Sequence, residues 1–170
     1  FTAAVLRAKF DDFPNCKGAK IIEIESGQTL SLDPFKLQFL NVSHSIPQAV
    51  STAIETKYGT VVHSGDWNRD PTPVIGRPTD EEAFKSVGER GVLAYIGDST
   101  NCLVPGRGGS ETTVQAGLEQ LFSEIKGRVA ITIFASNVGR IHSISLAAKK
   151  AGRKVSLLWS SLHRTAAPVR

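Results

Sequence analysis

Three clusters of polar residues follow short apolar stretches of the chain, and each holds one side chain that could bind a metal ion. The first cluster contains His44, the second Asp66 and the third Asp98. Open α/β folds place their ligand-binding groups just past the ends of strands. Neutral imidazole and carboxylate are also the ligands that a hydrolytic zinc centre uses. These three residues are therefore candidates for a metal site that activates water.

Each of the three residues also has a plain structural interpretation. A single histidine after a strand, such as His44, is more often a hydrogen-bonded residue of the fold than a metal ligand. The pairs Gly65-Asp66 and Gly97-Asp98 have the composition of ordinary turns. Residue type alone therefore does not establish a metal site.

A second candidate site lies at residues 134–140, where an apolar stretch meets a predicted helix. Ser136 or Asn137 is a natural N-cap for that helix. The free backbone N–H groups of a helix start, a hydroxyl, an amide and the Arg140 guanidinium could also bind a phosphate. Arg140 could equally pair with a nearby carboxylate, so both interpretations stay open.

The elements that would position these residues are mostly strands before residue 105. Short β-branched or alternating runs predict the strands, and Tyr58-Gly59 supplies a turn between two of them. The last run is apolar throughout and predicts a buried strand after a short helix. The predicted strands are residues 19–25, 35–42, 51–56, 60–63 and 92–96, and the predicted helix is residues 81–87.

After a glycine-rich turn at residues 105–110 the pattern alternates between helix and strand, which is typical of a parallel sheet with covering helices. Gly127 and Gly152 lie where helices commonly end. The predicted helices are residues 111–126 and 137–151, and the predicted strands are residues 128–134 and 154–159. The sequence thus predicts an α/β protein with two domains, residues 1–105 and 106–170.

Composition places the chain among ordinary globular proteins, with 170 residues of which 41% are hydrophobic and 21% charged. It has no apolar run of membrane-spanning length and no signal-peptide pattern, so we expect a cytoplasmic protein without a membrane partner. The formal net charge of +4 permits a polyanionic partner and also suits many soluble proteins. The lack of methionine and the helix-like start at Phe1 lead us to expect an interior fragment.

Four motifs follow one another in an order that can be compared with a known family. They are NVSHSIPQAV, YGTVVHSGDWNRDPTPVIGRPTD, GVLAYIGDSTNCLVPGRGGSE and RVAITIFASNVGRI. On these motifs, nearly the whole chain resembles bacterial ribonuclease J, a metallo-β-lactamase-fold nuclease with an inserted β-CASP domain. The resemblance implies part of a metallo-β-lactamase αββα sandwich over residues 1–105, followed by the start of a β-CASP parallel α/β domain over residues 106–170.

The resemblance also implies a role for each candidate residue of the metal site. His44 matches the third metallo-β-lactamase motif, whose histidine ligates zinc, and Asp66 matches the fourth motif, whose carboxylate bridges two metals. Asp98 matches the first β-CASP motif, an acidic residue near the metals that orients ligands or handles protons. In a complete site with two Zn²⁺ ions, a shared hydroxide would attack phosphorus while both metals offset the developing charge.

The same resemblance favours binding of an RNA phosphate by Ser136 and Asn137, with Arg140 as a further candidate. Two features of the family are missing from the sequence. The chain contains neither the zinc motif His-x-His-x-Asp-His nor the later histidine motifs of the β-CASP domain. Because a zinc site normally needs three or four protein ligands and the chain supplies two, we expect it to be inactive alone.

The leading interpretation is a metal-dependent hydrolase, namely a zinc-dependent ribonuclease of RNA processing and decay. Endonuclease activity is expected, and 5′-to-3′ exonuclease activity and a homo-oligomer are both compatible with the resemblance. One alternative is another hydrolase of the metallo-β-lactamase fold, since one fold supports many chemistries. The other is a non-catalytic, truncated homologue that binds RNA or a partner. An upstream His-x-His-x-Asp-His motif in the parent reading frame would favour the enzyme.

Overall fold

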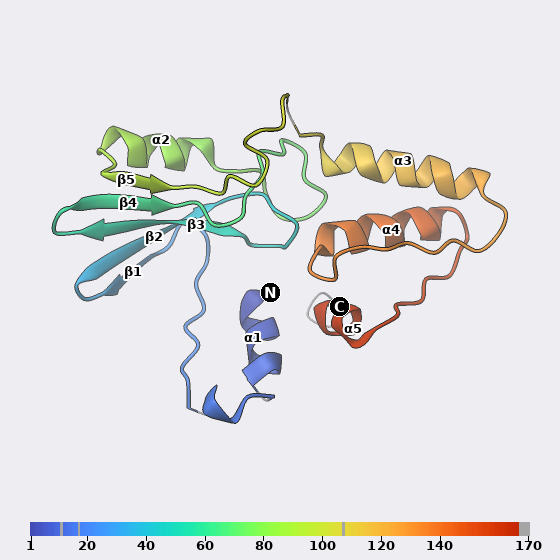
Figure 1. Ribbon diagram of the computed structural model, residues 1–170, viewed down its shortest axis with the longest axis horizontal. Coiled ribbons are helices and arrows are strands. Elements are labelled where there is room, and N and C mark those ends of the chain that lie inside the picture. The colour runs from blue at the N-terminus through green and yellow to red at the C-terminus, as the bar shows by residue number, and fades with distance from the viewer. Residues whose placement is uncertain (11, 17, 107, 167–170) are drawn as a thin grey trace.

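The computed structural model describes residues 1–10, 12–16, 18–106 and 108–166. Figure 1 shows the β-sheet with helix α2 at one end of the molecule and the paired helices α3 and α4 at the other. The helices α1 and α5 lie below them in that view. Arg164 of α5 donates a 3.2 Å hydrogen bond to Asp12, just after α1, so the two helices approach each other. No helix in these residues is long and apolar enough to span a membrane.

The sheet is an antiparallel meander with one parallel strand added at its edge. Strands β1 (Thr29–Leu32), β2 (Phe35–Asn41), β3 (Val50–Thr56) and β4 (Gly59–His63) each pair antiparallel with the next. Strand β5 (Ala94–Ile96) then pairs parallel with β4. Because β3 separates β2 from β4, the strands β2, β4 and β5 all run in the same direction. Their carboxyl ends therefore meet at one edge of the sheet.

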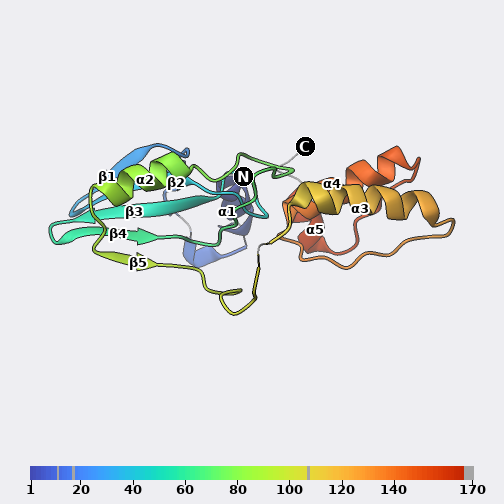
Figure 2. The same ribbon diagram turned by 90° about the horizontal axis from the view of Figure 1, so that it is seen from above.

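Helix α2 (Glu81–Glu89) covers one face of this sheet, as Figures 1 and 2 show. The side of α2 that faces the sheet centres on Val87, which is 1% exposed. Val87 packs with Leu40, Ala53 and Val62 of the strands. Ala53 lies opposite Val62 in the β3–β4 register, so their side chains occupy the same face. Burial of this apolar surface provides the main driving force for this layer.

The remaining helices form separate layers. Helices α3 (Glu111–Glu124) and α4 (Val138–Lys150) pack together around Phe122, Ala147 and Ala148. Each of the two has a polar N-cap, Ser110 for α3 and Asn137 for α4, and the sequence predicted the second of these. The other elements of the described residues are α1 (Thr2–Phe10), the short 3₁₀ turn η1 (Pro14–Cys16) and α5 (Ser160–Ala166).

The structure confirms most predicted elements, and the protein is α/β with five α-helices and one mixed sheet of five strands in the described residues. The predicted strands at residues 35–42, 51–56 and 60–63 are present, as are the helices at residues 81–87, 111–126 and 137–151. The strand predicted at residues 19–25 is wrong. The first strand is instead β1, because residues 29–32 pair with β2 across the short turn at Asp33-Pro34, whereas residues 19–25 have no strand partner.

The two strands predicted after α3 are also wrong. Residues 128–134 and 154–159 contain no strand, so the predicted parallel sheet does not form in this described part of the chain. Of the alternating residues, Val129 packs against the Phe122 cluster, whereas Ile131 is 40% exposed. A strand requires a backbone ladder with a neighbour, and alternation alone does not supply one.

The run at residues 92–96 forms a strand, β5, but the prediction that it is buried is wrong. Leu93 is 64% exposed, and Tyr95 and Ile96 are each 55% exposed. The reason is its position, because β5 is the last strand in the sheet order and pairs on one side only. An apolar run therefore predicted the strand correctly but could not place it in the sheet.

The packing around Leu40 generates a stability prediction. Leu40→Ala should lower the free energy of unfolding by about 2–5 kcal/mol, because it removes a side chain that is 1% exposed and leaves a cavity under α2. Urea titration followed by circular dichroism measures the effect. The matched control is Leu103→Ala, since Leu103 is 92% exposed and its loss should change stability by less than about 0.5 kcal/mol. Equal losses in both variants would contradict this account of the core.

Candidate functional site

The loops that follow the three strands of common direction bring the predicted metal-site residues together. His44 lies just after β2 and Asp66 just after β4, and the distance from His44 Nε2 to Asp66 Oδ2 is 3.7 Å. The proximity that the sequence predicts is therefore present. It results from strand direction, since β2 and β4 end at the same edge of the sheet.

Asp98 follows β5 at the same edge. Its backbone N–H donates a 2.9 Å hydrogen bond to Ser64 Oγ, and the Ser64 N–H donates to the carbonyl of Ile96. Asp98 Oδ1 accepts hydrogen bonds from the hydroxyl and the backbone N–H of Thr100. These two bonds lower the pKa of Asp98 below its ordinary value of 3.8, and the charge of His44 lowers it further. Asp98 is therefore a carboxylate held in place by hydrogen bonds at the same edge of the sheet as His44 and Asp66.

The turn before Asp66 presents that carboxylate to solvent. Gly65 has a φ of 60°, which is in the left-handed region that favours glycine. Its N–H donates a 3.2 Å hydrogen bond to His63 Nδ1, so His63 supports the turn. The Asp66 side chain is 81% exposed and the His44 side chain 30% exposed. Both can therefore reach a ligand from solvent.

The donor atoms fit zinc in kind but do not complete a zinc site. Imidazole nitrogen and carboxylate oxygen are normal zinc ligands. Within the described ranges, however, no three histidine, cysteine, aspartate or glutamate side chains are arranged to hold a metal ion. The pair His44 and Asp66 is thus at most part of a ligand set.

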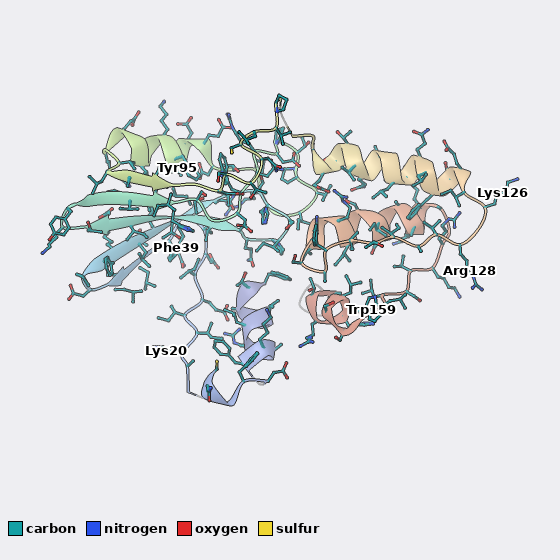
Figure 3. The ribbon with its side chains drawn as sticks, in the orientation of Figure 1. Lys20, Phe39, Tyr95, Lys126, Arg128 and Trp159 are labelled. Atoms are coloured by element: carbon teal, nitrogen blue, oxygen red, sulfur yellow. The ribbon has the colours of Figure 1, made fainter. Side chains whose placement is uncertain are left out.

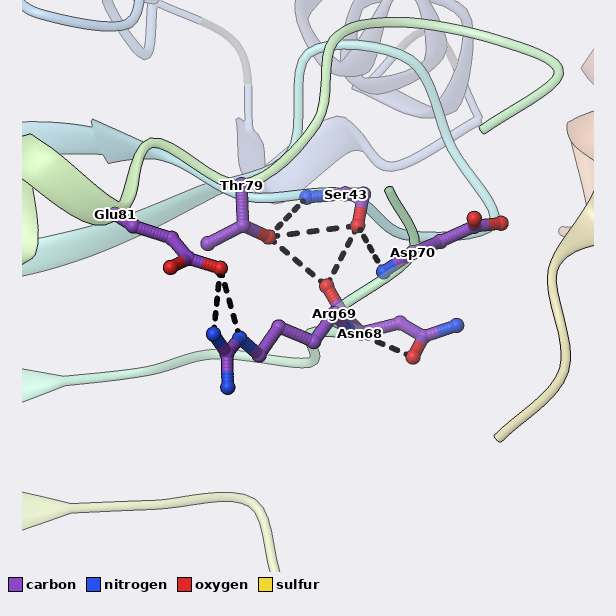
Figure 4. A network of polar contacts seen from close by, with 6 residues as sticks. All are labelled: Ser43, Asn68, Arg69, Asp70, Thr79 and Glu81. Carbon is purple, nitrogen blue, oxygen red and sulfur yellow. Dashed lines mark hydrogen bonds and ion pairs between the residues drawn. The ribbon is translucent and has the colours of Figure 1, made fainter. Parts of the chain in front are cut away.

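A partly buried polar network fixes the loop after Asp66 against the loop before His44 (Figure 4). Ser43 is 3% exposed, and its hydroxyl donates a 2.6 Å hydrogen bond to the carbonyl of Asn68. The Thr79 hydroxyl donates to the same carbonyl and accepts from the Ser43 N–H. The Asp70 N–H donates to Ser43 Oγ. Sequence reasoning missed these residues, although the polar composition of residues 68–80 was a signal that this loop is built from hydrogen bonds.

Asp70 links this network to the start of α3. It is 5% exposed, and its two carboxylate oxygens accept 2.9 Å and 2.8 Å hydrogen bonds from the N–H groups of Thr72 and Glu111. Burial by itself would raise the pKa of Asp70. The hydrogen bonds from Glu111, Ser110 and Thr72 outweigh that effect, so the pKa lies below 3.8. A buried charged carboxylate therefore holds the first turn of α3 onto the loop that follows Asp66.

The start of α4 lies against the loop of His44. The N–H of Gly139 donates a 3.1 Å hydrogen bond to the carbonyl of Ser45, the residue after His44. Asn137 is the N-cap, because its side-chain oxygen accepts a 2.8 Å hydrogen bond from the N–H of Arg140. The predicted phosphate site and the predicted metal site are therefore neighbours.

Two interactions were predicted for Arg140, phosphate binding and pairing with a carboxylate. The structure shows the pairing with a carboxylate. The Arg140 Nη2 and Nε donate hydrogen bonds of 2.9 Å and 3.2 Å to the two carboxylate oxygens of Glu111. Both side chains are about one third exposed. This fork connects the first turns of α3 and α4. Ser136 is exposed one residue before the cap.

Comparison with known proteins supports the resemblance that the motifs predict. Ribonuclease J of Sinorhizobium meliloti is 44% identical over 164 residues, which cover 96% of this chain and 29% of that protein. Ribonuclease J of Corynebacterium glutamicum is 39% identical over 164 residues, or 96% of this chain and 23% of that protein. Ribonuclease J of Helicobacter pylori is 34% identical over 94% of this chain and 23% of that protein. The chain thus spans less than a third of these relatives.

The fold has a counterpart among solved structures. A protein of unknown function from Enterococcus faecalis V583 superposes with a TM-score of 0.64 at 16% sequence identity, covering 96% of this chain and 40% of that chain. This likeness concerns the fold alone. No family model matches the chain. The sequence matches confirm the resemblance to a segment of ribonuclease J.

The two-ligand geometry generates a prediction for zinc binding. After dialysis against metal-free buffer, the 170-residue chain should retain well under one zinc ion per chain, because His44 and Asp66 supply fewer than the three or four ligands of a stable site. Inductively coupled plasma mass spectrometry measures the content. Retention of close to two tightly held zinc ions per chain would contradict it.

The environment of Asp70 generates a pH prediction. Because the folded pKa lies below the ordinary value of 3.8, the charged carboxylate stabilises the fold above that pH. The contribution is lost as the pH falls through the lowered folded value. Asp70→Asn should lower the free energy of unfolding by about 1–3 kcal/mol at neutral pH, and the difference from the unmodified chain should shrink in acid.

Urea titrations of both proteins at neutral and acidic pH measure this difference. The control is Asp33→Asn at an exposed carboxylate, which should change stability by less than about 0.5 kcal/mol at either pH. A stability loss in Asp70→Asn that does not depend on pH would show that the charge of Asp70 has no such role.

Proposed function

We propose that this chain, which is ribonuclease J-like in sequence over 96% of its length, is part of a zinc-dependent ribonuclease. The enzyme would hydrolyse phosphodiester bonds of RNA in cytoplasmic RNA processing and decay, as an endonuclease and also as a 5′-to-3′ exonuclease. The observation that carries the proposal is the 3.7 Å approach of His44 to Asp66 at the edge where three strands of common direction end. A partly exposed imidazole and an exposed carboxylate at such an edge suit a hydrolytic metal site.

The residues of the site would divide the chemistry between them. His44 would offer its Nε2 to one zinc ion, and the exposed carboxylate of Asp66 would offer its two oxygens to two zinc ions. Bound zinc would supply an activated hydroxide at neutral pH and offset the charge that develops on phosphorus. Asp98, held by Thr100, would orient neighbouring ligands or accept a proton.

The helix start beside this pair would position the RNA. Ser136 can donate its hydroxyl, and the positive end of the α4 dipole favours a phosphate beside it. The Asn137 side chain is engaged as the cap, so its contribution would come through the helix start that it holds. Arg140 is paired with Glu111, and a phosphate would have to share that guanidinium with the carboxylate. The hydrogen bond from Gly139 to Ser45 keeps this helix start next to His44.

The test compares two substitutions in the protein encoded by the complete reading frame that contains this chain. Asp66→Asn should reduce cleavage of a 5′-monophosphorylated RNA by several powers of ten, because metal-activated hydroxide accounts for much of such a rate enhancement. Ser136→Ala should reduce it by about one to two powers of ten, since one charge-assisted hydrogen bond is worth about 1.5–3 kcal/mol. The measurement is the cleavage rate at saturating zinc.

Both side chains are exposed, so neither substitution should change the thermal midpoint of unfolding, which serves as the control for folding. Equal losses in the two variants would show that the metal bridge is assigned to the wrong residue. Nearly unchanged cleavage by Asp66→Asn would also show that the metal bridge is assigned to the wrong residue.

A further inference from the structure

The end of the α3–α4 pair that lies away from the sheet carries a concentration of positive charge. Figure 3 shows Lys126 and Arg128 there, at the turn that follows α3. The other cations come from the last turn of α4 and the segment after it. The cluster, which we call the distal basic cluster, consists of Lys126, Arg128, Lys149, Lys150, Arg153 and Lys154.

Arg153 brings the two turns together. Its guanidinium donates hydrogen bonds to the backbone carbonyls of Phe122, Ile125 and Gly127 at the end of α3. Its own N–H donates a 2.8 Å hydrogen bond to the carbonyl of Ala148 in α4. The turn after α3, which carries Lys126 and Arg128, therefore lies beside the end of α4 and the segment after it, which carry Lys149 and Lys154.

Two of the six cations in this cluster interact with other groups of the chain, and four do not. Arg153 is occupied by carbonyls and Lys150 is paired with Glu119. The remaining four are exposed, and none forms an ion pair or a side-chain hydrogen bond within the described part of the chain: Lys126, Arg128, Lys149 and Lys154. Interaction with the negative end of the α4 dipole can account for Lys149 in the last turn. It does not account for the other three.

Positive and negative residues are unevenly distributed in the molecule. The cluster holds six of the 20 lysines and arginines, and its neighbourhood at the end of α3 and α4 holds two of the 16 acidic residues, Glu119 and Glu124. These six cations and two anions give this end a formal net charge of +4, while the other 14 cations and 14 anions of the sequence are equal in number. Like charges held together on a surface repel each other, and a polyanion relieves that repulsion.

We propose that the distal basic cluster binds the phosphate backbone of single-stranded RNA. The choice of RNA among polyanions rests on the proposed function. The cluster lies at the far end of α3 from Asp70, and a helix of 14 residues spans about 21 Å. The surface would therefore hold a part of the strand well away from the candidate cleavage site. Backbone contacts of this kind give affinity without sequence preference.

The test measures binding of a fluorescein-labelled oligouridylate to the 170-residue chain by fluorescence anisotropy across a series of salt concentrations. The cluster variant replaces all four free cations with glutamine: Lys126→Gln, Arg128→Gln, Lys149→Gln and Lys154→Gln. It should bind about tenfold or more weakly at low salt, and its salt slope should be smaller by up to about 2.8, given about 0.7 for each phosphate contact of a single strand.

The matched control also removes four exposed positive charges and reaches the same net charge: Lys9→Gln, Lys20→Gln, Lys57→Gln and Lys85→Gln. Because these lysines are scattered, the control should keep most of the affinity and the salt slope. Equal weakening in both variants would mean that only net charge matters and would overturn the proposal. Unchanged binding by the cluster variant would do the same, as would binding of phosphatidylserine vesicles without binding of the oligouridylate.

Nuclease assays of the parent protein separate this proposal from the proposed function. A parent protein without nuclease activity would refute the proposed function while this binding persists. A parent protein with nuclease activity and normal binding by the cluster variant would refute the cluster alone.

Discussion

The carboxylate of Asp70 is buried and charged, and the arrangement of the molecule depends on its hydrogen bonds. Its oxygens hold the N–H groups of Thr72 and Glu111, while its own N–H reaches Ser43 beneath the loop of His44. A buried charge is stable only when its hydrogen bonds are made. The start of α3 therefore cannot move from this loop without a large cost, and Glu111 carries the constraint onward to Arg140 at the start of α4.

This constraint gives the molecule two ends with different electrostatics. At the junction, the first turns of α3 and α4 meet the loops of His44 and Asp66, and helix N-termini favour negative groups such as phosphates and carboxylates. The opposite ends of the same helices carry the distal basic cluster. The helices thus place the candidate site and the distal basic cluster about one helix length apart, and the proposed function and the proposed RNA contact use one of these regions each.

Errors of prediction came from pairing and not from composition. The alternation at residues 128–134 and 154–159 is genuine, yet these segments lie beside α3 and α4 without a strand partner. The run at residues 92–96 is a strand, but its place at the sheet edge leaves Tyr95 and Ile96 exposed. Residues 19–25 precede the first pairing partner of β2. In each case, whether a strand forms and how deeply it is buried depends on its pairing neighbours, which local periodicity does not record.

The sequence by itself determined helices α2, α3 and α4 with the cap at Asn137, the meander strands β2, β3 and β4, and the resemblance that singles out His44 and Asp66. The helices and strands depend on residue types within a few positions of one another, and the resemblance depends on motifs read along the chain. Only the tertiary structure decided that Arg140 pairs with Glu111, that Asp70 joins α3 to the loop after Asp66, and that Arg153 joins the end of α4 to the end of α3. Such contacts join residues far apart along the chain, and their partners are selected by the geometry of packed elements, which no local pattern encodes.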